Sequence, residues 1–224
     1  MFIELSYEIG PDIPVYPGSP RDEFIPVSRM KEGDVCNATV LKHYLHNGTH
    51  VDAPFHFGRD SRTIDQISID DFVYYQPLVI GKRLHRSELV EPADLLSYGD
   101  SLYSADILLI FTGFSQFRND TAVFADDFPA ISRESAELIR KSLLNVKAVA
   151  IDTLSIESPT LGPESDFEVH RTLLDERLYD TRPLLVYEDV NIARVVDKKI
   201  RMICAFPLRL KGLDASPVSM VAEI

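Results

Sequence analysis

The chain has 224 residues and a net charge of −12; 45% of its residues are hydrophobic and 26% are charged. This composition is typical of a soluble globular protein, and the length fits one domain covering residues 1–224. The negative charge argues against nucleic acid and anionic membranes as partners, because both repel an acidic surface. No apolar run approaches the about 20 residues that a membrane helix requires, and the N-terminus lacks the features of a signal peptide.

Apolar runs predict strands at residues 2–9, 36–46, 76–81, 105–113, 146–156, 182–190, 200–210 and 216–224. A loop is expected at 11–20, which holds four prolines. Helical patterns cover 86–99, 132–145 and 170–178, and Ser132 is the expected N-cap of the clearest helix. Strands in hairpin order with few crossover helices predict the α/β class, with a single domain and a mixed sheet of the swivelling β/β/α type.

The two cysteines, Cys36 and Cys204, lie far apart and belong to no metal-binding pattern. We expect two buried, reduced thiols, which are typical of cytoplasmic proteins. A cytoplasmic location is therefore the expectation from cysteine usage.

Three of the six histidines lie within the stretch HNGTHVDAPFHF, residues 46–57. The polar side chains His46, His50, Asp52 and His56 are separated by even numbers of residues. In an extended chain such residues point to the same side, whereas on a helix they would diverge. The glycine and the proline inside the stretch also argue against a helix. The stretch is therefore expected to present imidazoles and a carboxylate to one place.

Two imidazoles and a carboxylate, here His46, His50 and Asp52, suit a borderline divalent ion such as zinc, manganese or iron. Zinc is the first expectation and manganese the alternative. The other interpretation is a hydrogen-bonded polar turn in which His46 and His50 only cap backbone groups.

The stretch matches every fixed position of HxGTHxDxPxHF and so resembles the signature of the metal-dependent cyclase or kynurenine formamidase-like hydrolases. Two further segments support this resemblance. VAIDTLSIESP is similar to the family's strand that ends in Asp-x-x-Ser, here Asp152 and Ser155, and FPLRLKGLDASPV is similar to its closing segment.

The resemblance implies one or two metal ions in each chain. His46, His50 and Asp52 would bind one ion, and Asp52 would bridge to a second ion held by His170 and Glu188. Glu188 lies 18 positions after His170, a longer gap than in the relatives, so Glu176 is a rival ligand, although it falls in the expected helix. From the residues alone, His170 is a surface helix residue and Glu188 an ordinary strand residue.

The resemblance also implies a reaction, the hydrolysis of an amide-type C–N bond such as that of N-formylkynurenine. A bound divalent ion can lower the pKa of water to about 7, and His56 would carry the proton to the leaving nitrogen. His56 could instead be a third ligand or orient a ligand. A cyclic amide, imide or lactone hydrolase, such as an isatin hydrolase, and a metal-stabilised binding protein remain as alternatives.

The expected substrate contacts are aromatic side chains close to the signature. Phe55 and Phe57 flank His56, Phe114 falls where the family's segment has a tryptophan, and Ser155 ends the similar strand. The remaining histidines, His43 and His85, are expected to lie outside the site. The resemblance further implies a small-molecule substrate and a homodimer or homotetramer.

Overall fold

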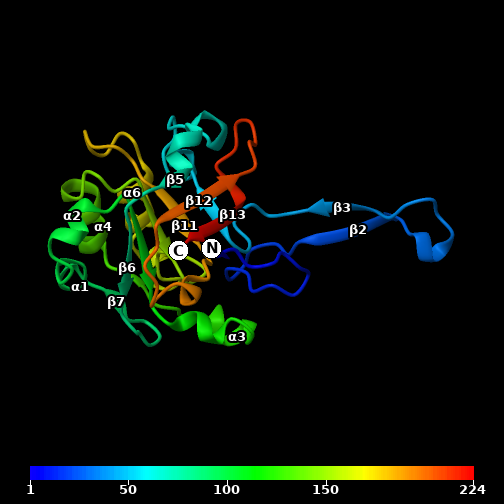
Figure 1. Ribbon diagram of the computed structural model, residues 1–224, viewed down its shortest axis with the longest axis horizontal. Helices are drawn as coiled ribbons and strands as arrows, with labels where there is room; N and C mark the ends of the chain where they lie inside the picture. The colour runs from blue at the N-terminus through cyan, green and yellow to red at the C-terminus, as the bar shows by residue number, and fades with distance from the viewer.

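The structure is a computed structural model that describes residues 1–224. A nine-stranded mixed sheet forms its centre (Figure 1). Its strands are β1 (Phe2–Glu4), β4 (His50–Asp52), β5 (Val73–Tyr74), β6 (Pro77–Gly81), β8 (Ile107–Phe111), β10 (Ala148–Ile151), β11 (Leu185–Glu188), β12 (Met202–Pro207) and β13 (Ala215–Glu223). Their order is β5–β12–β13–β4–β11–β10–β8–β6, with β1 paired to β13.

One half of the sheet is parallel and the other half is antiparallel. Strands β6, β8, β10 and β11 pair in parallel, whereas β4 pairs antiparallel with both β11 and β13. Strand β4 thus joins the two halves and lies inside the sheet, with a neighbour on each side. The α/β class and the mixed sheet predicted from the sequence are confirmed.

Few helices accompany the sheet, as predicted, and four of them, α1, α2, α4 and α6, lie together on one side of it in Figure 1. The helices are α1 (Pro92–Leu96), α2 (Asp100–Ser104), α3 (Thr121–Phe124), α4 (Arg133–Ser142), α5 (Leu161–Glu164) and α6 (Glu168–Leu174). None of them combines the length and the apolar character needed to cross a membrane. Two small sheets complete the fold: β2 (Glu23–Ser28) with β3 (Ala38–Lys42), and β7 (Leu89–Val90) with β9 (Ala130–Ile131).

The central strands are buried on both faces, which explains their continuous apolar sequences. Alternate residues of β8 enter different cores: Leu109 belongs to a cluster of 23 buried residues and Leu108 to one of 21. The second cluster also contains Ile139 from α4 and Leu173 from α6. Helix α4 begins as predicted, since the Ser132 hydroxyl accepts the backbone N–H of Ser135 at 3.2 Å. These helices cover one face of the strands that carry the polar site.

Several boundaries differ from the expectation because long-range packing determines them. The strand expected at 36–46 ends at Lys42, and the helix expected at 170–178 is α6, which ends at Leu174 and leaves Glu176 outside it. The prediction of two buried thiols is wrong, because Cys36 is exposed and Cys204 is partly exposed. Cys36 lies at the β2–β3 hairpin, which projects from the body where no core can bury it (Figure 1).

Candidate metal centre and active site

The histidine-rich stretch reaches the centre of the sheet through β4. His50 and Asp52 belong to this strand, and Glu188 of β11 is the registered partner of His50. His46 precedes the strand in a turn, and His56 ends a 3-10 helix (Pro54–His56). The expected extended conformation therefore holds only for the strand. The side chains nevertheless converge, because the chain turns at both ends of β4.

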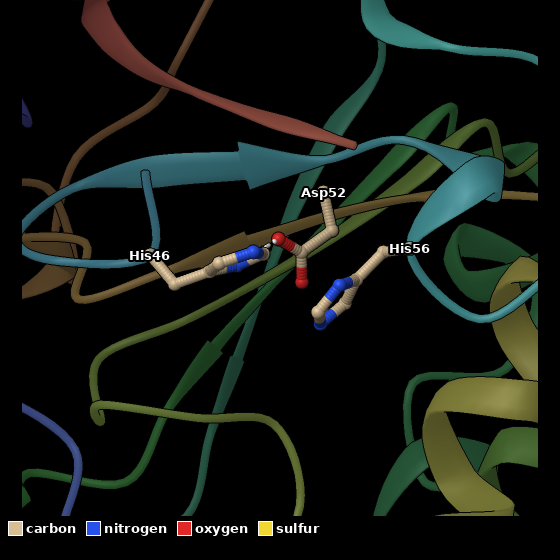
Figure 2. A group of neighbouring side chains, drawn as sticks. All are labelled: His46, Asp52 and His56. Carbon is tan, nitrogen blue, oxygen red and sulfur yellow. Dashed lines mark ion pairs between the residues drawn. The ribbon is translucent and has the colours of Figure 1, made fainter. Parts of the chain in front are cut away.

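Short polar contacts join these side chains. The His46 Nδ1 atom lies 2.9 Å from Asp52 Oδ1, and the His50 Nε2 atom lies 3.5 Å from the same oxygen. His50 Nε2 is also 3.4 Å from Glu188 Oε2. Figure 2 shows the Asp52 carboxylate between the imidazoles of His46 and His56. The predicted residues are thus close enough to share one or two cations.

The potential ligand atoms form two groups, and within each group all of these atoms lie within 4.8 Å of one another. One group consists of His46, Asp52 and His56, and the other of His50, Asp52 and Glu188. Asp52 belongs to both groups, which agrees with the expected bridging role. The sequence-based expectation placed His46 and His50 on the same ion, whereas the structure groups His50 with Glu188. The structure also brings His56 close enough to Asp52 to share an ion with it. This position suits His56 both as a proton carrier and as a third ligand.

The buried atoms of this cluster fit a metal ion. Both carboxylate oxygens of Asp52 and the Nε2 atom of His50 are buried without a hydrogen-bond partner, despite the nearby charges. Such groups normally cost about 1–3 kcal/mol each when unsatisfied. His50 Nδ1 donates to the carbonyl of Gly48 at 2.9 Å, which leaves Nε2 as the nitrogen that can bind a cation. The donor set of imidazoles and carboxylates is also the set that zinc and manganese accept.

His170 is not a surface residue, because it is only 4% exposed. Its Nδ1 atom donates to Glu157 Oε2 at 2.7 Å, and its Nε2 atom lies 3.2 Å from Glu188 Oε1. Glu157 also accepts the backbone N–H groups of Val169 and His170 at 3.2 Å. This carboxylate orients the imidazole so that Nε2 faces Glu188, as partners of metal-binding histidines commonly do. Sequence reasoning missed this role of Glu157, although the residue lies in the segment VAIDTLSIESP.

Asp214 is a second site residue that the sequence analysis missed. Its Oδ2 atom lies 2.9 Å from His46 Nε2 and 3.2 Å from His56 Nδ1. These two hydrogen bonds are the main cause that holds the pKa of the Asp214 carboxyl far below its usual range. An ionised Asp214 fixes the ring of His56 with Nδ1 as donor, which leaves Nε2 to exchange a proton. The sequence contained a signal for this residue, because Asp214 lies in FPLRLKGLDASPV, the segment that resembles the family's closing segment.

The pKa values show how the cluster balances its charge without a cation. Burial opposes protonation of His46, but the charge of Asp52 and the hydrogen bond that His46 donates to Asp214 raise its pKa to about 9. Burial likewise opposes protonation of His170, yet Glu157 and Glu188 raise its pKa to about 10. Burial favours the neutral form of Glu188, whereas the hydrogen bond from His170 and the nearby His50 imidazole lower its pKa to about 2. A bound cation would therefore replace protons on these imidazoles.

A cavity of about 190 Å³ opens beside the cluster. Its polar floor includes His46, His56, His170 and Glu188, and its aromatic wall consists of Tyr16, Tyr44, Phe57 and Phe167. Ser155 also lines it and donates to Glu188 Oε1 at 3.1 Å. Phe57 and Ser155 thus lie where substrate contacts were expected. The volume suits a ligand with about one aromatic ring, since drug-sized ligands occupy about 300–1,000 Å³.

The other two expected substrate contacts lie outside the cavity. Phe55 points to the surface and is 37% exposed. Phe114 packs with Phe124 and Phe128 in a small hydrophobic cluster. The reason is local geometry: Gly113 has a φ of +75° and turns the chain, so the aromatic ring that follows enters the core. These two expectations are therefore corrected.

The remaining candidates lie away from the cluster. Glu176, the rival ligand, accepts the Nε–H of Arg62 at 2.6 Å and makes no contact with the histidines. His43 pairs with Asp22 at 2.7 Å, and His85 is exposed, so both lie outside the site as predicted.

A buried network behind the site fixes the ends of its strands. Asp189, which follows Glu188, receives two hydrogen bonds from Arg118 at 2.8 and 2.7 Å. The Thr49 hydroxyl donates to the Asp189 carbonyl at 2.6 Å and accepts the backbone N–H of Tyr7 at 2.9 Å. The threonine of the signature therefore ties β4 to the end of β11, and this contact maintains the distance between His50 and Glu188.

The fold and the site together present a candidate metal centre of histidines and carboxylates beside a cavity. The model of the Cyclase family matches residues 3–158, and the chain belongs to that family; it is a metal-dependent hydrolase. It is 27% identical over 229 residues to a kynurenine formamidase of Bacillus mycoides (strain KBAB4), an alignment that covers 98% of this chain and 96% of the relative. A kynurenine formamidase of Bacillus anthracis is 25% identical over 228 residues, with the same coverage.

Solved structures share the fold at lower sequence identity. Isatin hydrolase A from Labrenzia aggregata, bound to benzyl benzoate, superposes with a TM-score of 0.79 at 18% identity and covers 99% of this chain and 93% of its own. An isatin hydrolase bound to the product analogue thioisatinate gives a TM-score of 0.81 at 17% identity and covers 100% and 92%. These comparisons confirm the architecture that surrounds the candidate site.

Proposed function

We propose that this hydrolase cleaves the amide C–N bond of a small aryl formamide, with N-formylkynurenine as the expected substrate. The observation that carries the proposal is the pair of ligand groups sharing Asp52 beside an aromatic cavity. The names of the relatives from the two Bacillus species support this substrate class over other amides.

The residues that would hold the metal are His46, His50, Asp52, His170 and Glu188, with zinc as the expected ion and manganese as the alternative. One or two ions fit the two overlapping groups. When bound, a divalent ion polarises the carbonyl and makes water acidic enough to attack near neutral pH. The protein's own contribution is to orient the ligands through buried partners such as Glu157.

His56 moves the proton in this proposal. Its Nε2 atom takes a proton from the attacking water and delivers it to the leaving nitrogen, while the carbonyl carbon gains an oxygen and loses the nitrogen. Asp214 keeps the imidazole in the required tautomer through the contact with Nδ1 at 3.2 Å. The aromatic wall of the cavity, with Phe57 and Tyr44, would contact the aryl ring of the substrate.

A turnover screen of the metal-loaded protein tests this function. We expect the highest kcat/KM with N-formylkynurenine, and lower values with isatin and simple cyclic imides. A clear preference for isatin would identify a cyclic amide hydrolase that uses the same residues. Absence of turnover on all substrates, with metal content verified by elemental analysis, would favour a metal-stabilised binding protein instead.

A further inference from the structure

The segment KRLHR, residues 82–86, is strongly basic, although the chain as a whole has a net charge of −12. Two of its cations are neutralised by ion pairs: Lys82 binds an aspartate of α1, and Arg86 binds an aspartate of the loop after α3. Arg83 forms no ion pair, and its guanidinium instead faces an aromatic ring. An arginine without an acidic partner is a potential anion-binding group, because its planar guanidinium matches a carboxylate.

Arg83 borders a cavity of about 480 Å³ that is separate from the cavity beside the metal centre, since the two share no residue. We call it the Arg83 cavity. It is lined by residues 83–86 together with Phe114, Gln116, Phe117 and Val123. None of its lining residues is acidic, although the chain holds 35 aspartates and glutamates. An anion in this cavity would therefore meet the positive charge of Arg83 without a carboxylate in the lining to repel it.

The Arg83 side chain is held in place by the backbone beneath it. A Cβ atom at Gly113 would lie 3.4 Å from both the Cγ and the Nη1 atoms of Arg83, so the absence of a side chain at Gly113 makes room for the arginine. The guanidinium carbon lies 5.8 Å from the centroid of the Phe111 ring, within the range of a cation–π contact. The backbone N–H of Leu84 donates to the Thr112 carbonyl at 2.9 Å. The guanidinium is thus preorganised, which reduces the entropic cost of binding a ligand.

An aromatic surface lies in the same cavity. The Phe117 side chain is 40% exposed, which leaves part of its ring free to contact a ligand. Phe114 is buried and supports this ring, with the two centroids 5.2 Å apart in an edge-to-face arrangement. Val123 adds an apolar side chain to the lining. The cavity therefore offers a fixed cation and an apolar surface to one ligand.

We propose that the Arg83 cavity binds a small aromatic carboxylate, as a second ligand site outside the metal centre. The carboxylate accepts hydrogen bonds from the Arg83 guanidinium, and the ring packs on Phe117 and Val123. Charge-assisted hydrogen bonds are roughly twice as strong as neutral ones, so a neutral aromatic molecule lacks the stronger contact. A small aliphatic anion leaves the surface of Phe117 uncovered. The volume lies within the range of about 300–1,000 Å³ that is usual for small-molecule sites.

Methyl NMR on the metal-loaded protein, titrated with benzoate, tests the proposal. The methyl groups of Leu84 and Val123 should shift in a saturable manner, because both side chains line the Arg83 cavity. Benzamide keeps the ring without the charge, and acetate keeps the charge without the ring. Each should bind at least about tenfold more weakly than benzoate, since each loses one of the two contacts. Absence of saturable shifts at these methyl groups, or equal binding of benzamide or acetate, would overturn the proposal.

Two variants locate the charge that holds benzoate. Arg83→Met keeps an apolar stem without the guanidinium, and Gln116→Glu adds a negative charge to the lining at nearly constant size. Both should weaken benzoate binding at least about tenfold, whereas Gln116→Glu should leave benzamide binding unchanged. The control Arg201→Met, at an exposed arginine paired with Glu223, should keep the wild-type affinity. Wild-type affinity for benzoate in either cavity variant, or an equal loss in the Arg201 control, would contradict the assigned site.

Discussion

The two halves of the metal centre are built in different ways. His46, His50, Asp52 and His56 come from one short stretch around β4, and the Asp52 oxygens face imidazoles and accept no backbone N–H. Glu188 comes from β11, and its Oε1 atom accepts the backbone N–H of Ile156 at 2.7 Å. The residues of the first half are close in sequence, but the charge of their carboxylate lacks backbone partners. The residues of the second half come from distant segments, and the Glu188 carboxylate is satisfied by hydrogen bonds. In the proposed site, the first half would need the cation and the second half would position it.

The largest effect should come from Asp52, because this carboxylate is common to both ligand groups. We expect Asp52→Asn to reduce metal content and turnover to background. The amide keeps the shape of the side chain but removes the negative charge that both groups share. Elemental analysis and kcat measure the two effects, with Asp70→Asn as a control at an exposed site. Full metal content in the Asp52 variant would refute the shared role.

His56 tests whether the first half contains a group other than a ligand. His56→Ala should reduce kcat by about 10²–10⁴, the usual contribution of a general acid–base group, and should leave most of the metal bound. The exposed His85 provides the control variant His85→Ala, which should behave as the wild type. If the His56 variant loses metal as completely as Asp52→Asn, then His56 is a ligand and the proton carrier lies elsewhere.

Glu157 tests the positioning function of the second half. Glu157→Gln keeps the shape of the side chain but removes the charge that accepts from His170 Nδ1. Metal affinity should fall about 10–100-fold, as is usual for partners of metal-binding histidines. Competition with a chromogenic chelator measures this loss, and Glu164→Gln on the neighbouring helix α5 is the control. Wild-type affinity in the Glu157 variant would show that α6 alone orients the imidazole.

The smallest effect should be that of metal removal on the free energy of unfolding. The pH dependence of this effect shows whether protons and the metal compete for His170. The pKa of His170 is raised from 6.5 to about 10 in the folded protein. Its ion pairs therefore stabilise the metal-free protein fully below pH 6.5, and this stabilisation is lost as the pH rises through about 10. Metal binding displaces the proton from His170, so the affinity for the metal should increase as the pH rises from 6.5 to about 10.

Thermal unfolding with and without zinc measures this linkage. Zinc at about 100 times its Kd should add about 2.7 kcal/mol, or roughly 5–10 °C in Tm for a chain of this length. The gain should be larger at about pH 8 than at about pH 6, where protons compete for the imidazoles. An unchanged Tm after verified removal of the metal would support the polar-turn interpretation of the stretch.

The sequence by itself determined the part of the site that lies on β4. The even spacing of His50 and Asp52 on a strand places both side chains on one face, because strand geometry has a period of two residues. The apolar runs around 105–113 and 146–156 likewise predicted β8 and β10, since strands covered on both faces need apolar residues throughout. The family resemblance supplied His170 and Glu188, which the residues alone did not suggest.

Only the tertiary structure decided which distant residues complete the site. Asp214 reaches His46 and His56 because β13 pairs with β4, a contact across more than 150 residues. Glu157 meets His170 because the loop after β10 packs on α6, and Phe114 enters the core because the chain turns at Gly113. Spacing along the chain carries no information about such contacts, since they depend on strand order and register. Local geometry therefore set the first ligands, and strand pairing selected their partners.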